Sequence, residues 1–237
     1  FNGNMTRLIW YSRKKRGSYT IPKTVKAIDN TVFRYHKKLT SVVIPDTITK
    51  IDAYTFLGCS RLEAVTIPNS VAYIGDHAFS NCSSLKTVVI PNSVTSIGGY
   101  AFDSCKKMTE FFIPSSVVSL GINPFIKCEQ LRRIEVADGN DHFKVVDGVL
   151  FNKEMTRLIS YGACTQSNYA IPDSVTSIGN CGFYNCSSLT SITIPKSIAS
   201  IGDCVFYYCY NLREVTIPSD LSYPSNAFPG SATITKY

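Results

Sequence analysis

Apolar residues recur along this chain with a period of 23 residues, and an Ile-Pro pair marks each period. Five pairs follow one another at this spacing, and three more resume after an interruption. The pairs begin at Ile21, Ile44, Ile67, Ile90, Ile113, Ile171, Ile194 and Ile217. A fixed period in this range is the signature of a solenoid, in which each repeat forms one coil of a stack. We therefore expect function to lie on the exposed side of the stacked coils.

Seven of the 23 positions in a repeat are apolar from copy to copy. Written from its first Ile, the unit reads I-P-x-S-V-x-x-I-G-x-x-A-F-x-x-C-x-x-L-x-x-V-x. Neither a helical period of 3.6 nor simple alternation fits this spacing, whereas a coil wound around an interior axis does. The unit alternates at its end, so we expect Val88 and Ile90 to point inward and Val89 to point outward. Such strands stack into a parallel sheet, and the Pro that follows each strand ends it because Pro has no N–H.

Two further features of the repeat predict local structure. Position nine holds Gly in most copies, which we interpret as a backbone position with positive φ; these residues are Gly75, Gly98, Gly121, Gly179 and Gly202. The segment A-F-x-x-C is interpreted as a short helical turn. Its Phe residues are predicted to form a column through the core, namely Phe33, Phe56, Phe79, Phe102, Phe125, Phe183 and Phe206.

Cysteine occupies position 16, once per coil, at Cys59, Cys82, Cys105, Cys128, Cys186 and Cys209. Zinc sites need clustered pairs of ligands and a disulfide framework is spaced differently, so these residues are predicted to be free, buried and apolar in character, with no metal site. His36 holds the same position in the first repeat and is expected at the end of the core. Cys181 and Cys204 share position 11 of adjacent coils, a separation that permits a disulfide. Cys164 in the interruption is an alternative partner.

The interruption, residues 136–170, has alternating apolar residues on both sides of Asp147-Gly148, a dipeptide typical of hairpins. We predict a three-stranded β-meander there, with a second turn near residues 152–154. Residues 1–22 align without gaps on residues 151–172 with 11 identities, so residues 1–20 are interpreted as a truncated copy of this hairpin, and further repeats are expected upstream in the parent protein.

The chain is accordingly expected to form one solenoid domain over residues 1–237. Its predicted order is the truncated hairpin (1–20), five repeats (21–135), the meander insertion (136–170), two repeats (171–216) and a C-terminal cap (217–237). The repeat consensus decays in the last segment, as is normal for a terminal repeat that covers an open core.

Composition narrows the class of protein. With 237 residues, 44% of them hydrophobic, the chain can bury a continuous core, and it has no run of 18 apolar residues that would insert into a membrane. Four charges of the net charge of +7 fall in the run Arg13–Arg16. A solvated loop tip is the favoured interpretation of this run, and contact with an acidic partner is the alternative. No nucleic-acid-binding motif accompanies it.

No constellation of catalytic residues stands out. The three histidines lie in different segments, and the sequence has no G-x-S-x-G, H-E-x-x-H or P-loop motif. We therefore expect neither an enzyme nor a cofactor. Residues 138–141, Asp-Gly-Asn-Asp, are interpreted as a turn, because an EF-hand calcium loop needs alternating ligands and a distant Glu.

The unit I-P-x-S-V-T-S-I-G-x-x-A-F-x-x-C-S-S-L-T-S-V-T, with its V-D-G-V-L-F-N-K insertion, closely resembles the BspA-like leucine-rich repeats over essentially the whole chain. The resemblance implies a β-rich α/β, right-handed leucine-rich-repeat solenoid with a concave parallel sheet and with short strands and helical turns on the convex side. Family members are mostly secreted or cell-surface proteins of host-associated anaerobic bacteria, associated with adhesion and co-aggregation. The resemblance provides no catalytic motif and names no ligand.

The outward positions of the predicted strands supply the candidate site. Val43, Val89 and Phe112 are expected to face solvent on the concave sheet, near the charged residues Glu110, Arg132 and Arg133. An apolar patch edged by charge suits a protein partner, although β-branched residues also favour strands for their own sake. A second candidate patch lies outside the sheet and comprises Tyr73, Tyr184, Tyr207, Tyr208 and Tyr210.

Two functions remain open at this point. The favoured one is a non-enzymatic extracellular or cell-surface adhesion module, a monomeric domain of a larger protein. It is expected to bind a host matrix protein or a host or bacterial cell-surface protein through the concave sheet, with the hairpin as a further contact. The alternative is a structural spacer that displays another domain of the parent protein. Neither nucleic-acid binding nor membrane insertion is expected.

Overall fold

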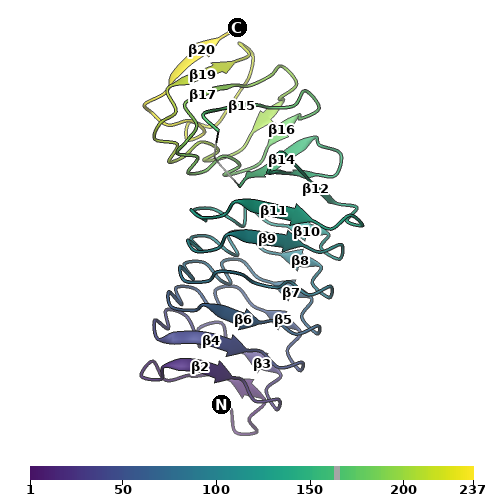
Figure 1. Ribbon diagram of the computed structural model, residues 1–237, viewed down its shortest axis with the longest axis vertical. Coiled ribbons are helices and arrows are strands. Elements are labelled where there is room, and N and C mark those ends of the chain that lie inside the picture. Colours follow the sequence, from purple (N-terminus) through teal and green to yellow (C-terminus); the bar gives the residue numbers. More distant parts are fainter. Residues whose placement is uncertain (163–165) are drawn as a thin grey trace. The chain divides into compact units, whose positions relative to one another are not determined.

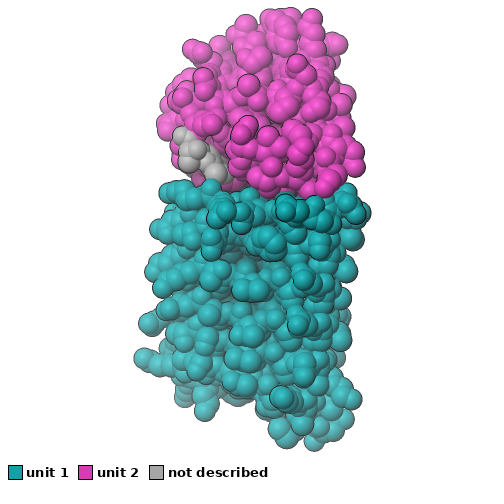
Figure 2. All heavy atoms as spheres, turned by 45° about the vertical axis from the view of Figure 1, so that its right-hand side comes forward, with its two compact units in different colours: residues 1–142 teal, residues 143–237 magenta. Residues whose placement is uncertain are grey.

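The computed structural model describes residues 1–162 and 166–237, and within these residues it contains strands and turns but no helix (Figure 1). The chain divides into two compact units, residues 1–142 (unit 1) and residues 143–237 (unit 2), coloured separately in Figure 2. Each unit is built from coils that pair through parallel strands, which confirms the solenoid. The single domain over residues 1–237 stays a prediction.

Unit 1 carries two kinds of strand, a longer strand and a two-residue strand, which alternate along most of its length. They are β1 (Arg7–Leu8), β2 (Gly17–Thr20), β3 (Ala27–Ile28), β4 (Leu39–Val43), β5 (Lys50–Ile51), β6 (Ala64–Thr66), β7 (Tyr73–Ile74), β8 (Ser96–Ile97), β9 (Glu110–Ile113), β10 (Ser119–Leu120) and β11 (Arg133–Val136). The longer strands form the parallel sheets β2-β4-β6 and β11-β9, and the short strands form β1-β3 and β10-β8-β7-β5. Residues 85–90, which lie between β6 and β9 in the sequence, have no strand assigned.

Unit 2 begins with the predicted meander. Its strands are β12 (Phe143–Val146), β13 (Val149–Asn152), β14 (Arg157–Tyr161), β15 (Asn168–Ala170), β16 (Ser177–Ile178), β17 (Ser191–Thr193), β18 (Ser200–Ile201), β19 (Glu214–Ile217) and β20 (Thr233–Lys236). β12, β13 and β14 pair antiparallel, and β14 then pairs in parallel with β16, so the meander extends a solenoid sheet. Asp147 and Gly148 both have positive φ, as a two-residue type I′ hairpin turn requires.

The predicted column of Phe residues is confirmed within each unit. Phe33, Phe56, Phe79 and Phe102 are fully buried in unit 1, and successive ring centroids in this column lie 5.2 to 5.3 Å apart in stacked pairs. In unit 2, Phe206 stacks on Phe183 on one side and on Phe228 on the other, so the C-terminal segment closes the core with one more ring. Strand β20 pairs with β19 and completes this last coil.

The A-F-x-x-C segments are not helical, and the prediction of a helical turn is wrong. In a helix every N–H donates four residues back along its own chain. Here the N–H of Ala78 donates to Gly75 of its own coil, while the N–H of Phe79 donates to Ala101 of the next coil. His77 and Asn81, on either side, have positive φ, which turns alternate N–H groups outward. The segment therefore bonds one coil to the next.

Glycine at position nine has a different role from the predicted one. Within the repeats, the residues in the left-handed region are at positions 11 and 15, and none of Gly75, Gly98, Gly121, Gly179 and Gly202 is among them. A Cβ added to Gly98 would lie 2.4 Å from the backbone N of Asp76, and one added to Gly121 would lie 2.2 Å from that of Gly99. Position nine is glycine because adjacent coils touch there, backbone to backbone.

The position-16 cysteines are buried, and Cys59, Cys82, Cys105, Cys128 and Cys209 are free thiols as predicted. Each of these thiols donates to the carbonyl oxygen of the Phe in the preceding coil, as from Cys82 Sγ to Phe56 O at 3.2 Å. Cys186 is engaged in a disulfide bond, so the prediction of a free thiol is wrong at this position. Cys204 has a free thiol, so the structure does not form the Cys181–Cys204 disulfide. Cys164 lies outside the described residues.

His36 fills the same position in the first repeat and is buried at the start of the column. Its ring lies 5.2 Å from that of Tyr11, and its Nε2 lies 3.0 Å from the backbone oxygen of Ser12. The expectation of a core histidine is therefore confirmed, and the histidine also attaches the chain before β2 to the first repeat.

Candidate functional site

The outward side chains of the longer strands in unit 1, together with those of residues 87–90, form a surface that we call the main face; it comprises β2, β4, β6, residues 87–90, β9 and β11. Side chains alternate in β9, where Phe111 and Ile113 are buried and Glu110 and Phe112 are exposed. The same alternation holds at residues 88–90, where Val88 and Ile90 are buried and Val89 is 75% exposed. Val89 and Phe112 are therefore large apolar residues that are exposed to solvent because they occupy outward positions of the repeat.

A groove of about 230 Å³ lies on this face between residues 87–90 and β9. Its outward lining residues are Thr87, Val89, Glu110, Phe112 and Glu135, and the buried Val88, Ile90 and Phe111 complete it. The groove lies beside the segment that has no strand assigned, so the main face is interrupted where its apolar residues are exposed.

Charged side chains border the groove on one side. The β9–β11 register places Arg133 beside Glu110 and Glu135 beside Phe112. Arg133 forms an ion pair with Glu135, and both side chains are about half exposed. A solvent-exposed pair of this kind adds little stability. Its main effect is to place a positively charged and a negatively charged side chain near Phe112.

The structure brings together part of the predicted site. Val89, Glu110 and Phe112 line the groove, and Arg133 is adjacent through its register. Val43 lies on β4 and is 41% exposed, but it does not line the groove. Arg132 is turned away from it, since its Nη1 donates to the backbone oxygen of Glu129 at 3.2 Å. Glu135 and Thr87 were not among the predicted site residues, although both occupy outward positions in the same series.

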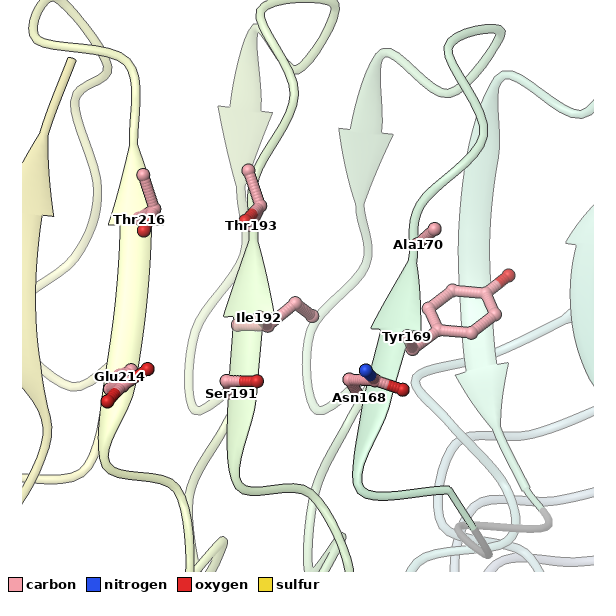
Figure 3. Close-up of a pocket in the computed structure, with 8 residues that line it drawn as sticks. All are labelled: Asn168, Tyr169, Ala170, Ser191, Ile192, Thr193, Glu214 and Thr216. Carbon is pink, nitrogen blue, oxygen red and sulfur yellow. The ribbon is translucent and has the colours of Figure 1, made fainter.

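Unit 2 has a corresponding face of different character. A pocket of about 410 Å³ lies over β15, β17 and β19. Figure 3 shows its outward side chains in two rows across the strands, with Asn168, Ser191 and Glu214 in one row and Ala170, Thr193 and Thr216 in the other. The rows consist of small and polar residues, so this face lacks the large apolar side chains of the groove in unit 1.

Exposed and half-buried aromatic residues gather in two places outside these faces. In unit 1, His77 is stacked between Tyr54 and Tyr100, with ring centroids 5.2 and 4.8 Å away. In unit 2, the predicted patch of Tyr184, Tyr207, Tyr208 and Tyr210 is a set of mutually contacting rings. Tyr73, the fifth residue of the predicted patch, lies on β7 in unit 1 and is not part of this set of rings.

The position-16 thiols are buried in the core. Burial raises the pKa of the Cys59, Cys128 and Cys209 thiols to about 12, so each stays protonated at neutral pH and is a poor nucleophile. Within the described residues, no group of three or more His, Cys, Asp or Glu side chains could hold a metal ion.

The side chain of Asn140 fixes the turn at residues 138–141. The buried Asn140 amide donates to the carbonyl oxygens of Pro114 and Val117, and its oxygen accepts from the His142 N–H. Throughout the part of the chain that is described, no helix is long and apolar enough to cross a membrane.

Comparison with known families gives one match. Residues 10–152 and 159–237 match, in six copies, the family described as "BspA type Leucine rich repeat region". No curated protein matches the chain.

Several solved structures are similar to the chain. The pneumococcal vaccine antigen PcpA is 26% identical, with a TM-score of 0.73, over 93% of this chain and 65% of that chain. A leucine rich cell surface protein from Faecalibacterium prausnitzii A2-165 is 28% identical, with a TM-score of 0.70, over 91% of this chain and 70% of that chain. A leucine-rich repeat protein from Bacteroides ovatus ATCC 8483 is 26% identical, with a TM-score of 0.58, over 98% of this chain and 73% of that chain. The chain thus spans slightly less than two thirds of PcpA.

Proposed function

Because this chain belongs to the BspA-type leucine-rich-repeat family, we propose that it is a non-enzymatic binding module that engages a protein partner through the groove on the main face of unit 1. The partner is a host matrix or cell-surface protein, and the module works at the cell surface or outside the cell. The cell-surface description of the Faecalibacterium prausnitzii relative supports this location.

The observation that carries the proposal is the exposure of Val89 and Phe112 in one groove. Val89 is 75% and Phe112 is 48% exposed, whereas the other Phe residues on described strands, Phe111, Phe143 and Phe151, are all buried. Binding sites on proteins combine an apolar centre, where an aromatic side chain contributes much of the affinity, with a polar rim. Phe112 supplies such a centre here, and Glu110, Arg133 and Glu135 supply the rim.

The charged rim contributes more to the specificity of binding than to its affinity. Exposed ion pairs such as Arg133–Glu135 contribute little by themselves, but their arrangement selects a partner with complementary charges and affects the rate of association. Arg133 can turn from Glu135 to an acidic group of the partner, while Glu110 and Glu135 accept from basic or amide groups.

The proposal is tested by capture from serum and extracellular-matrix proteins, followed by affinity measurement with the captured protein. The double variant Phe112→Ser/Arg133→Ser should bind at least roughly 30-fold more weakly, because removing a central aromatic residue typically costs about 2 kcal/mol or more. The unfolding curve should stay close to that of the original protein, because both side chains are exposed.

Val118→Ser is the matched control, since Val118 is 49% exposed and precedes β10 in the other sheet. This variant should keep full affinity. Equal loss in both variants, or full affinity in the double variant, would place the site elsewhere. A failure to capture any partner would favour the spacer function.

A further inference from the structure

The positive charge of the chain is concentrated at one end of unit 1. Residues 1–62 contain 12 of the 24 Lys and Arg residues but only 3 of the 17 Asp and Glu residues, which gives them a formal charge of +9. The remaining residues carry a formal charge of −2. An asymmetry of this size attracts polyanions and repels polycations over distances of about a Debye length, roughly 10 Å at moderate salt.

Seven of these cations come together at one corner of three successive coils, which we call the basic corner; they are Arg13, Lys14, Lys15, Arg16, Lys37, Lys38 and Arg61. The N–H of Gly17 donates to Lys38 O at 3.0 Å, and His36 contacts Ser12, so the Arg13–Arg16 run lies against residues 36–38. The N–H of Glu63 donates to Thr40 O at 2.8 Å, which places Arg61 one coil beyond Lys38. In Figure 1 the turns that lead into β2, β4 and β6 stack on the same side of the coils.

The cations of the basic corner are available to a ligand. Lys38 is half-buried and the other six are exposed. None of the seven forms an ion pair with any described residue; the ion pairs of unit 1 involve Arg7, Lys50, Lys106 and Arg133 instead. Glu63 follows Arg61 by two residues but is not among the described ion pairs, and bringing seven like charges together costs energy. A polyanion that neutralised them would recover that energy.

We propose that the basic corner binds a linear sulfated polysaccharide. The three turns repeat at the spacing of the strands, about 4.8 Å, so the cations form a line across the coils that suits a chain with repeating charges. The guanidinium groups of Arg13, Arg16 and Arg61 match the oxygens of an oxyanion such as sulfate through paired N–H donors. This interaction is independent of the groove on the main face.

The composition of the corner favours a polysaccharide over the other common polyanions. Single-stranded nucleic acids need aromatic platforms on which bases stack, and membrane surfaces need apolar side chains to insert. The exposed aromatic residue in these turns, Tyr35, is not a free platform, because the Arg34 guanidinium lies over its ring and the ring packs against Gly58. The exposed Ile9 and Trp10 nearby follow β1, which belongs to the other sheet of the unit, β1-β3, whereas the basic corner leads into β2, β4 and β6.

The test measures binding of the whole chain to heparin over a series of salt concentrations. Changing Arg13, Lys14, Lys15 and Arg16 together to Ser should weaken binding by roughly tenfold or more and reduce the dependence of log K on log salt concentration. The triple variant Lys37→Ser/Lys38→Ser/Arg61→Ser should weaken it as well, because these residues continue the same line on the next two coils.

The matched control changes Lys86, Lys107, Lys144 and Lys236 to Ser, which removes the same charge from exposed positions elsewhere. It should keep binding within about twofold. Equal weakening in the control would show attraction by net charge alone and overturn the proposal. Tighter binding to a single-stranded oligonucleotide or to phosphatidylserine vesicles than to heparin would also overturn it, in favour of that partner class.

Discussion

At the scale of single residues, the position-nine glycines show how the coils constrain the sequence. The space where a Cβ of Gly98 would lie is occupied by the backbone N and the carboxylate of Asp76 from the preceding coil, at 2.4 and 2.5 Å. A sequence shows that glycine recurs but not why, since positive φ and close approach select the same residue. Only the neighbouring coil distinguishes the two reasons.

Gly98→Ala should therefore destabilise unit 1 by about 1–3 kcal/mol, the usual cost of forcing an extra carbon into a packed region. Its control is Gly139→Ala, where the nearest atom to the new Cβ is 3.8 Å away, on Ser115. Urea unfolding should show a lower midpoint for the first variant and little change for the second. Equal midpoints would contradict the close backbone contact.

At the scale of elements, the A-F-x-x-C segments show where a sequence pattern predicts the wrong local structure. Phe79 and Cys82 are three residues apart, a spacing that fits a helical turn as well as the observed one. The observed turn differs from a helical turn in the positive φ of His77 and Asn81. Neither residue is a glycine, so the sequence gives no clear sign of a positive φ at these positions. The meander was predictable because Asp147-Gly148 does give that signal.

The buried thiols of the A-F-x-x-C segments make the stability of the fold depend on pH in the alkaline range. Burial raises the pKa of Cys59 from an ordinary 9.0 to about 12, so the unfolded chain loses this proton at lower pH than the folded chain. Stability is therefore complete below pH 9 and is lost as the pH rises from about 9 to 12, by about 1.4 kcal/mol per pH unit for each such thiol.

Cys59→Val isolates the contribution of one thiol to this dependence. Whatever its stability at pH 8, the free energy of unfolding of this variant should fall less steeply above pH 9 than that of the original protein. Urea titrations between pH 8 and 10.5 measure both slopes. Parallel slopes would mean that the Cys59 thiol ionises equally well in the folded and unfolded chain.

At the scale of the whole molecule, the repeat predicts what is periodic and misses what depends on local deviations. The Phe column, the parallel pairing and the outward position of Val89 all follow from the 23-residue register. The groove beside residues 85–90 does not, because it arises where one coil lacks the strand that its neighbours form. The sequence predicts the difference between the faces of the two units, because the outward positions hold Val89 and Phe112 in unit 1 but Thr193 and Thr216 in unit 2. It does not predict the pockets on these faces.

We propose that inward columns of side chains hold the coils together and that the outward row around Phe112 binds a protein partner. Hydroxyl-radical footprinting read by mass spectrometry tests it most directly. In the free protein Phe112 should be oxidised readily and Phe79 and Phe102 protected, and the captured partner should protect Phe112 while the exposed Tyr54 keeps its rate. Oxidation of Phe79 at the rate of Phe112, or protection of Tyr54 instead of Phe112, would contradict the account.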